Sequence, residues 1–192
     1  MEIITFGQEV EKIIKKGGIG VLSTDTIYGL VGKALSKTTV SRIYRIKERK
    51  PDKPLIILIG SLRQLDLFGI AVDSKTQLLL NRFWPGKVSI ILPCSRPDLE
   101  YLHRGTNSLA FRFPDYPELT NLINQTGPLV APSANPEDLK PAKDIAQAKK
   151  YFSSKVDFYV NSGRLDSQPS TLISIKNGKI EVLREGAVKI NA

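Results

Sequence analysis

The chain has 192 residues, of which 41% are hydrophobic and 24% are charged, a composition typical of one soluble globular domain. Cys94 is the single cysteine, which excludes an intramolecular disulfide and fits a reducing cytosol. No run approaches about 18 consecutive apolar residues, and the amphipathic N-terminus lacks the apolar core of a signal peptide. We therefore predict a cytoplasmic protein, without a membrane span, that forms one domain over residues 1–192.

The chain is basic, because 28 Lys and Arg residues against 19 Asp and Glu residues give a net charge of +9. Such a surface favours anionic partners, either phosphate-bearing small molecules or nucleic acid. A solvated basic exterior without a partner explains the charge equally well. Charge therefore suggests a class of partner without deciding it.

Short buried runs alternate along the chain with stretches of helical periodicity. In chain order we expect a strand at Ile3–Phe6, a helix at Gln8–Lys16, a strand at Ile19–Ser23, a helix at Thr38–Lys47, a strand at Leu55–Ile59 and a helix at Ser74–Phe83. Next we expect strands at Val88–Pro93 and Leu109–Phe113, a helix at Tyr116–Gln125, a strand at Leu129–Ala131, a helix at Lys143–Phe152, and strands at Phe158–Val160, Thr171–Ile175 and Lys179–Leu183. Lys176, Asn177 and Gly178 give the last two strands a hairpin turn. The sequence thus predicts an α/β fold with a mixed sheet and flanking helices.

Several familiar catalytic arrangements are missing. The segment Trp84–Ser89 lacks the earlier glycine of a phosphate-binding P-loop. One histidine, His103, and one cysteine cannot form a His/Cys zinc cluster, and no Gly-x-Ser-x-Gly segment supports a serine nucleophile. A lone acid or base role for His103 stays open as an alternative. We therefore expect neither covalent nor metal–histidine catalysis, and no metal site.

Polar side chains follow several of the predicted strands. Within Ser23–Leu30, Thr24 and Asp25 follow a buried strand, where they can contact a ligand or cap a simple turn. Ligands of open α/β sheets gather in crevices at strand ends, so a recurrence of such residues indicates a shared site. Later strand ends carry Ser133, Asn135, Ser170 and Arg184.

A basic segment follows the helix that ends at Lys47. Lys47, Arg49, Lys50 and Lys53 are four cations within seven residues, and two prolines restrict their backbone. These cations can clamp a polyphosphate, or they can complement the dipole at the helix C-terminus. The prolines favour the first interpretation, because they hold the segment ahead of the next strand.

Arg112 lies in an apolar strand pattern. Strand alternation places it on one face with Ser108 and Ala110, opposite Leu109 and Phe111. A charge flanked by small residues indicates either the floor of a site or a solvated outer face.

Taken in order, these segments resemble the YrdC/TsaC family, threonylcarbamoyl-AMP synthases, in its single-domain form. The motifs are Ser-Thr-Asp-Thr-Ile-Tyr-Gly-Leu, Lys-x-Arg-x-x-x-Lys-Pro-Leu, Trp-Pro-Gly-x-Val-Ser, Ala-x-Arg-x-Pro, Ala-Pro-Ser-Ala-Asn, Pro-Ser-Thr and Leu-Arg-x-Gly, between about Ile19 and Gly186. The resemblance implies a twisted open sheet with a basic concave cavity. It also implies a nucleotidyltransferase, an L-threonylcarbamoyladenylate synthase that forms threonylcarbamoyl-AMP and pyrophosphate from L-threonine, bicarbonate and ATP.

The resemblance also implies roles for individual residues. It assigns threonine binding to Thr24, Arg112 and Ser170. It assigns ATP binding to Lys47, Arg49, Ser108, Ser133, Asn135 and Arg184. It names no catalytic nucleophile, and leaves positioning and charge neutralisation to Lys47 and Arg49. Mg²⁺ is expected with ATP, held largely by phosphates and water, with Asp25 as an outer-shell candidate.

The implied partner is a tRNA threonylcarbamoyl transferase complex, which uses the product to make threonylcarbamoyladenosine in tRNA. Direct RNA contact by this chain is left open. One alternative is an RNA-binding module without synthase activity, although 7% aromatic residues offer little for base stacking. A second alternative is carbamoyl transfer to another substrate.

The chain departs from the family pattern in four places. Leu58 stands where relatives often carry a histidine, so one threonine contact is expected to be missing or replaced. The segment Pro136–Pro141 replaces a serine-glycine pair, and its acidic residues are expected to shift a loop near the phosphates. Asp166, Ser167 and Gln168 precede Ser170 where glycine is usual. The chain also ends soon after Gly186, so we expect no second domain.

Overall fold

The computed structural model describes residues 3–176 and 179–190. The strands are β1 Ile3–Ile4, β2 Gly20–Ser23, β3 Tyr28–Lys33, β4 Ile56–Leu58, β5 Val88–Pro93, β6 Ser108–Arg112, β7 Leu129–Val130, β8 Phe158–Val160, β9 Thr171–Lys176 and β10 Lys179–Arg184. The α-helices are α1 Gln8–Lys15, α2 Lys37–Lys47, α3 Ser74–Phe83, α4 Glu100–His103, α5 Pro117–Thr126 and α6 Ile145–Phe152. The 3₁₀ helices are η1 Leu62–Phe68, η2 Pro97–Leu99 and η3 Ser153–Lys155. Of the expected hairpin turn, Asn177 and Gly178 lie outside the described residues.

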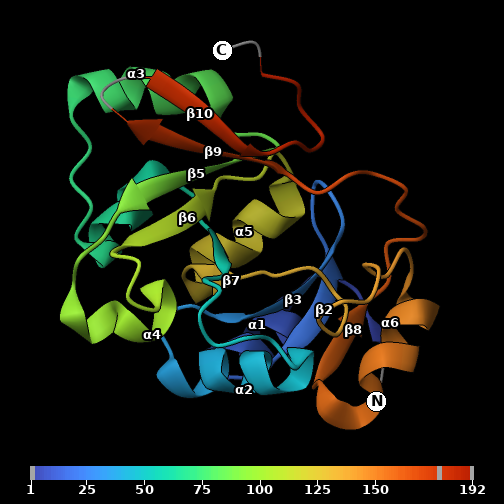
Figure 1. The fold of residues 1–192 in the computed structure, drawn as a ribbon. Coiled ribbons are helices and arrows are strands. Elements are labelled where there is room, and N and C mark those ends of the chain that lie inside the picture. The colour runs from blue at the N-terminus through green and yellow to red at the C-terminus, as the bar shows by residue number, and fades with distance from the viewer. Residues whose placement is uncertain (1–2, 177–178, 191–192) are drawn as a thin grey trace.

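The strands form one mixed sheet in the order β1-β8-β2-β3-β7-β4-β6-β5-β9-β10, and the sheet twists along this order (Figure 1). β4 pairs with β6 and β5 with β9 in parallel, whereas β5 with β6 and β9 with β10 are antiparallel. Helices lie on both sides of the sheet. The predicted α/β fold with a mixed sheet and flanking helices is therefore confirmed.

One strand was not predicted, because Ser23–Leu30 was interpreted as a loop. The chain turns over residues 24–27 and returns as β3, which pairs antiparallel with β2 from Ser23 opposite Tyr28. Gly29 and Gly32 weaken the strand signal of β3. Gly32 is required by packing, since a Cβ there would lie 2.5 Å from the side chain of Thr39 on α2. Gly32 therefore weakens the sequence signal of β3 and also allows α2 to pack closely against the sheet.

The core lies on both faces of the sheet, because successive strand residues point to opposite sides. On β4, Ile57 belongs to a large cluster that includes Phe68 and Phe111, whose rings are 4.9 Å apart in an edge-on arrangement. Leu58 belongs instead to a second cluster, which α1 and α5 cover. Each such buried side chain contributes about 1.5–3 kcal/mol to folding. Ala110 on β6 leaves part of one sheet face open, and the cavity described next forms there.

Candidate functional site

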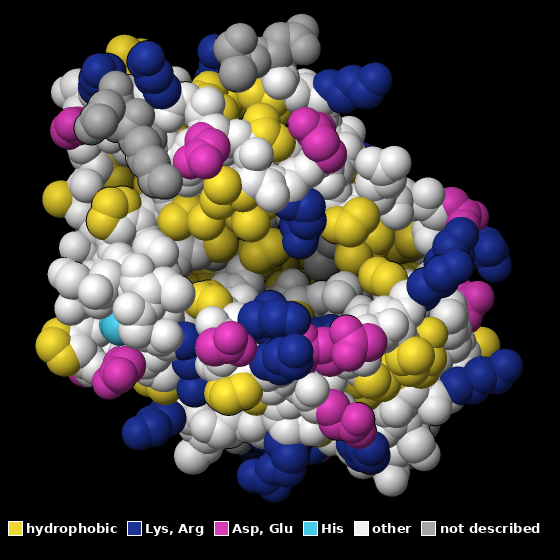
Figure 2. Space-filling model, viewed as in Figure 1, with side chains coloured by type: hydrophobic (Ala, Val, Ile, Leu, Met, Phe, Trp, Pro, Cys, Tyr) yellow, Lys and Arg dark blue, Asp and Glu magenta, His cyan; other side chains and the backbone are white. Residues whose placement is uncertain are grey.

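A cavity of about 380 Å³ opens between the sheet and the loops that follow its strands. Figure 2 shows a hollow near the centre of this face, with Lys and Arg side chains above and below it. Within the described part of the chain, the charged residues that line the cavity are Arg49, Arg112 and Arg184, and none of its lining residues is acidic. Its volume falls within the usual range for small-molecule sites.

The floor of the cavity comes from neighbouring strands. Ser108, Ala110 and Arg112 of β6 all line the cavity, whereas Leu109 and Phe111 are buried in the core. The predicted sharing of one strand face by these three residues is thus confirmed. The apolar remainder of the floor consists of Ile56, Ile91 and Leu172.

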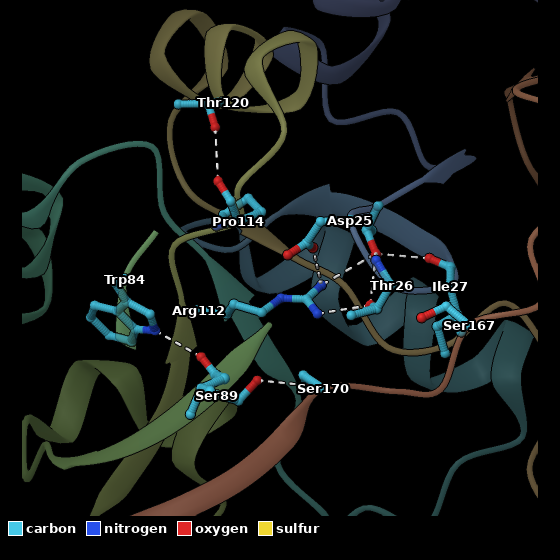
Figure 3. Close-up of polar contacts among 12 residues, drawn as sticks. Asp25, Thr26, Ile27, Trp84, Ser89, Arg112, Pro114, Thr120, Ser167 and Ser170 are labelled. Carbon is cyan, nitrogen blue, oxygen red and sulfur yellow. Dashed lines mark hydrogen bonds and ion pairs between the residues drawn. The ribbon is translucent and has the colours of Figure 1, made fainter. Parts of the chain in front are cut away.

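Arg112 is held at the end of β6 by the turn that follows β2 (Figure 3). Its Nη1 donates to Thr26 Oγ1 at 2.8 Å, and its Nη2 donates to Thr24 Oγ1 at 3.3 Å. Nη2 also lies 3.4 Å from Asp25 Oδ1 in an ion pair whose side chains are only 5% and 2% exposed. The β2–β3 turn therefore fixes the position of this cation.

The Asp25–Arg112 pair has unfilled hydrogen-bonding capacity. Both carboxylate oxygens of Asp25 and the Nε of Arg112 are buried, without a hydrogen-bond partner among the described residues. Burial raises the pKa of Asp25, and the charge of Arg112 opposes that shift. Burial likewise lowers the pKa of Arg112, against the effect of Asp25. The guanidinium is thus paired through its Nη atoms, while its buried Nε–H has no partner among the described residues.

Thr24 also stabilises its own turn. Its hydroxyl donates to Ile27 O at 2.8 Å and accepts from Thr26 N at 3.2 Å. The self-capped turn that the sequence left open as an alternative is therefore present. Thr24 still lines the cavity, as do Thr26 and Tyr28.

Lys47 lies away from the cavity lining. Its side chain is buried, and its Nζ donates to the carbonyl oxygens of Ser133 at 2.7 Å and Asn135 at 2.6 Å. The pKa of Lys47 is lowered to about 7, chiefly by burial and also by the nearby charge of Arg49, while Glu137 opposes both effects. In this structure Lys47 fixes the strand end that carries Ser133, and its ammonium is occupied by backbone oxygens.

The other cations of the basic segment, residues 47–54, diverge after Glu48, which ends α2 in a left-handed conformation with φ of 54°. Arg49 lines the cavity, and its Nε and Nη2 donate to the carbonyl oxygens of Lys53 and Pro54, both at 3.0 Å. Lys53 forms an ion pair with Glu137. Of the four cations predicted to clamp a polyphosphate, Arg49 alone reaches the cavity wall in the described structure.

Ser170 and Arg184 meet at the opposite wall. Arg184 Nη2 donates to Ser170 O at 2.7 Å, and the hydroxyls of Ser170 and Ser89 lie 2.8 Å apart. Ser170 and Arg184 both line the cavity. Burial lowers the pKa of Arg184, and the charge of Arg49 adds to this effect. The cavity thus brings together two cations, Arg49 and Arg184, from segments far apart in the sequence.

Two predicted site residues have different environments. Ser133 lines the cavity, whereas Asn135 is buried outside its lining and donates through Nδ2 to Pro136 O at 2.7 Å and Leu139 O at 2.8 Å. Asn135 therefore shapes the loop that follows it. Pro141 at the end of that loop lines the cavity, although the sequence had assigned it no site role.

Three residues that the sequence analysis singled out are buried in the protein interior, outside the cavity lining. His103 is buried, with Nδ1 accepting from Gly105 N at 3.2 Å and Nε2 lying 3.2 Å from Arg96 O. Leu58 is buried in the second core cluster. Trp84 is buried and donates through Nε1 to Val88 O at 2.7 Å (Figure 3).

Within the residues that the structure describes, no group of three or more His, Cys, Asp or Glu side chains could hold a metal ion. In the same residues no helix is long and apolar enough to cross a bilayer.

Comparisons with known proteins give consistent matches. The Sua5/YciO/YrdC model, described as telomere recombination, matches residues 12–186. The chain is 30% identical over 179 residues to the threonylcarbamoyl-AMP synthase of Pyrococcus abyssi, an alignment that covers 92% of this chain and 53% of that protein. It is 39% identical over 127 residues to the threonylcarbamoyl-AMP synthase of Bacillus subtilis, covering 64% of this chain and 36% of the relative. The chain thus spans about half of the first relative and about a third of the second.

Solved structures share the fold over the same length. The crystal structure of P. abyssi Sua5 complexed with L-threonine matches with a TM-score of 0.85 at 29% identity, covering 93% of this chain and 53% of that chain. The crystal structure of E. coli YciO matches with a TM-score of 0.82 at 25% identity, covering 94% and 89%. Because the family model spans nearly the whole sequence, the resemblance inferred from the motifs is confirmed. The chain therefore belongs to the Sua5/YciO/YrdC family.

Proposed function

We propose that this chain is an L-threonylcarbamoyladenylate synthase, which joins L-threonine, bicarbonate and ATP into threonylcarbamoyl-AMP and pyrophosphate. The observation that carries the proposal is the cavity itself, where three arginines and no acidic residue line a site built from the family motifs. The names of the relatives support the synthase over an RNA-binding module without activity. So does the L-threonine complex of the P. abyssi protein.

The threonine subsite is proposed at the end of β6. Arg112 has a free, buried Nε–H, and Thr24, Asp25 and Thr26 fix its guanidinium. A guanidinium in fixed orientation suits a carboxylate, because its planar donors match the two oxygens. Ser170 would add a hydroxyl from the opposite wall.

The nucleotide subsite is proposed between Arg49 and Arg184, with Ser108 and Ser133 on its walls. The positive charge of Arg49 lowers the pKa of Arg184, and two arginines that line one cavity are well placed to share an anion such as a triphosphate. Lys47 would act here by fixing the segment that carries Ser133, through its bonds to two carbonyl oxygens. Asn135 would act in the same indirect way, by shaping the following loop.

The reaction requires no protein nucleophile. The amine of threonine condenses with bicarbonate to give a carbamate and water, and the carbamate oxygen then attacks the α-phosphorus of ATP while pyrophosphate leaves. The protein's part is to bring the reactants together and to neutralise charge, which are the main contributions to such transfers. Mg²⁺ would enter with ATP as part of that substrate, held by phosphates and water. The lining residues fit this role, since they include arginines and hydroxyls and no carboxylate.

The product would be consumed by a tRNA threonylcarbamoyl transferase complex, in the cytoplasm. A mixed anhydride of a carbamate and AMP is activated for transfer, so it has to reach an acceptor before water hydrolyses it. This chain would therefore supply the activated group, and the transferase would supply the tRNA.

The test is direct detection of the product. Purified protein with ATP, Mg²⁺, bicarbonate and L-threonine should release pyrophosphate and yield the threonylcarbamoyl adenylate by mass spectrometry. Arg49→Ala should abolish both signals. Pyrophosphate release no greater than in a control without threonine would disprove the proposal.

A further inference from the structure

Two segments meet beside the cavity, and each contributes to its wall. The basic segment supplies Arg49 and Pro54, and the loop 133–141 supplies Ser133 and Pro141. A change in the distance between the two segments would therefore change the width of the proposed nucleotide subsite.

Glu137 joins these segments. Its Oε1 lies 2.5 Å from Lys53 Nζ, and its Oε2 accepts from the backbone N–H of Lys50 at 2.5 Å. Its own N–H donates to Lys47 O at 2.7 Å. The side chain is only 12% exposed, although it lies on a surface loop. One residue of the loop 133–141 thus makes three polar contacts along the basic segment.

The negative charge of Glu137 in loop 133–141 is compensated within the protein. The sequence predicts that negative charge near a phosphate site shifts this loop. Instead the carboxylate of Glu137 is matched by the Lys53 ammonium and a backbone donor. Hydrogen bonds to Lys53 and Lys50 lower the pKa of Glu137, so the carboxylate is ionised at neutral pH.

The contacts of Arg49 depend on the residues that Glu137 holds. The Arg49 guanidinium donates to Lys53 O and Pro54 O. Lys53 is the residue whose side chain pairs with Glu137, so the carboxylate fixes one acceptor of Arg49 through the same residue. Glu137 itself does not line the cavity in the described structure, and any effect on a ligand has to pass through Arg49.

We propose that Glu137 is a positioning residue for nucleotide binding, which holds Arg49 against the cavity wall by bridging loop 133–141 to the basic segment. The inference rests on the proposed function for the identity of the nucleotide. The contacts that define the bridge are present in the structure itself. Without the carboxylate, Lys50 and Lys53 lose the contacts that tie them to loop 133–141, and the carbonyl acceptors of Arg49 at Lys53 and Pro54 lose that restraint.

The experiment compares two neighbouring acids. Glu137→Gln removes the charge that holds Lys53, whereas Asp138→Asn removes the same charge one residue later, on an exposed side chain with φ of 69° that asparagine tolerates. The binding of ATP with Mg²⁺ is measured by titration calorimetry, and KM values are measured by pyrophosphate release. We expect Glu137→Gln to weaken ATP binding and raise the ATP KM by about tenfold, with an unchanged threonine KM. Asp138→Asn should match the wild type.

Lys53→Met gives the second test, because it removes the other partner of the ion pair. If Glu137 acts through Lys53, the double variant should bind ATP no more weakly than either single variant. Equal ATP affinity in Glu137→Gln and the wild type would overturn the positioning role, even if the melting temperature falls. Failure of the wild type to release pyrophosphate would contradict the proposed function alone, since calorimetry tests the bridge without turnover.

Discussion

The carboxylate of Asp25 lies 3.4 Å from the guanidinium of Arg112, and solvent reaches almost none of either side chain. This pair connects the β2–β3 turn to the end of β6, so it links the two elements on which the proposed threonine subsite depends. Removing one partner of a buried ion pair destabilises a protein far more than replacing both, because the remaining partner is left as an uncompensated buried charge. The pair therefore couples the stability of the fold to the geometry of the site.

Loss of the cation from this pair should destabilise the fold strongly. Arg112→Met should lower the free energy of unfolding by about 3–5 kcal/mol, because Asp25 would be left buried without its counter-charge. Adding Asp25→Asn should restore part of that loss. Urea denaturation of both single variants and the double variant measures the coupling. Strictly additive losses would show that the two side chains do not interact energetically.

The acid of this pair should also make stability depend on pH. Burial raises the pKa of Asp25 above its ordinary value of 3.8, so between 3.8 and the folded pKa the folded state binds more protons than the unfolded state. The free energy of unfolding contributed by Asp25 therefore falls as pH rises through that window. Stability measured from about pH 4 to about pH 7 should thus decline less in Asp25→Asn than in the wild type. Parallel curves for the two proteins would contradict the shift.

The division of the cavity into two subsites predicts opposite kinetic effects for two conservative variants. Arg112→Lys should raise the threonine KM by about tenfold, because lysine keeps the charge and loses the fixed planar donors. Arg49→Lys should raise the ATP KM by a similar factor and leave the threonine KM unchanged. Each variant is the control for the other in steady-state pyrophosphate assays. If both variants raise both KM values alike, the two arginines serve one shared subsite.

Local sequence patterns predicted the parts of this site that depend on one strand. Alternation along β6 placed Arg112 with Ser108 and Ala110, because side-chain direction in a strand depends on neighbouring residues alone. The same reasoning could not place Lys47. Its partners are carbonyl oxygens of Ser133 and Asn135, which lie 86 and 88 residues further along the chain. Backbone acceptors leave no mark in residue identity, so only the fold reveals them.

Position 58 shows a similar limit of motif comparison. The family pattern suggested that a threonine contact was missing or replaced at Leu58. The structure places Leu58 outside the cavity lining, in the second core cluster, which also contains Leu119, Leu122 and Ile123. Leu58 therefore shares a buried core with residues of α5, which a motif cannot report.

Leu58 should consequently matter for stability rather than for substrate affinity. Leu58→Ala should lower the free energy of unfolding by about 2–5 kcal/mol, the usual result of creating a cavity in a packed core. Leu139→Ala is a matched control, because that leucine is 51% exposed and its truncation should have little effect. Threonine and ATP KM values should be unchanged in both variants. A raised threonine KM in Leu58→Ala would instead place position 58 in the threonine subsite.

The buried lysine of the basic segment predicts a second pH effect, opposite in sign to that of Asp25. The pKa of Lys47 falls from 10.5 to about 7, chiefly because burial disfavours its charged form. Between these values the unfolded protein binds more protons, so the free energy of unfolding rises with pH, by at most about 1.4 kcal/mol per pH unit. Lys47→Met should remove this rise, and Lys50→Met, at an exposed position, should retain it.

Urea denaturation at about pH 7 and about pH 9 measures the slope, which separates the titration of Lys47 from the constant loss of its two hydrogen bonds in Lys47→Met. The comparison with Lys50→Met removes the contribution of any general change in net charge. If Lys47→Met gains as much stability between the two pH values as the wild type, Lys47 keeps its proton throughout. Its ammonium would then be a permanent charge, stabilised by the carbonyl oxygens of Ser133 and Asn135.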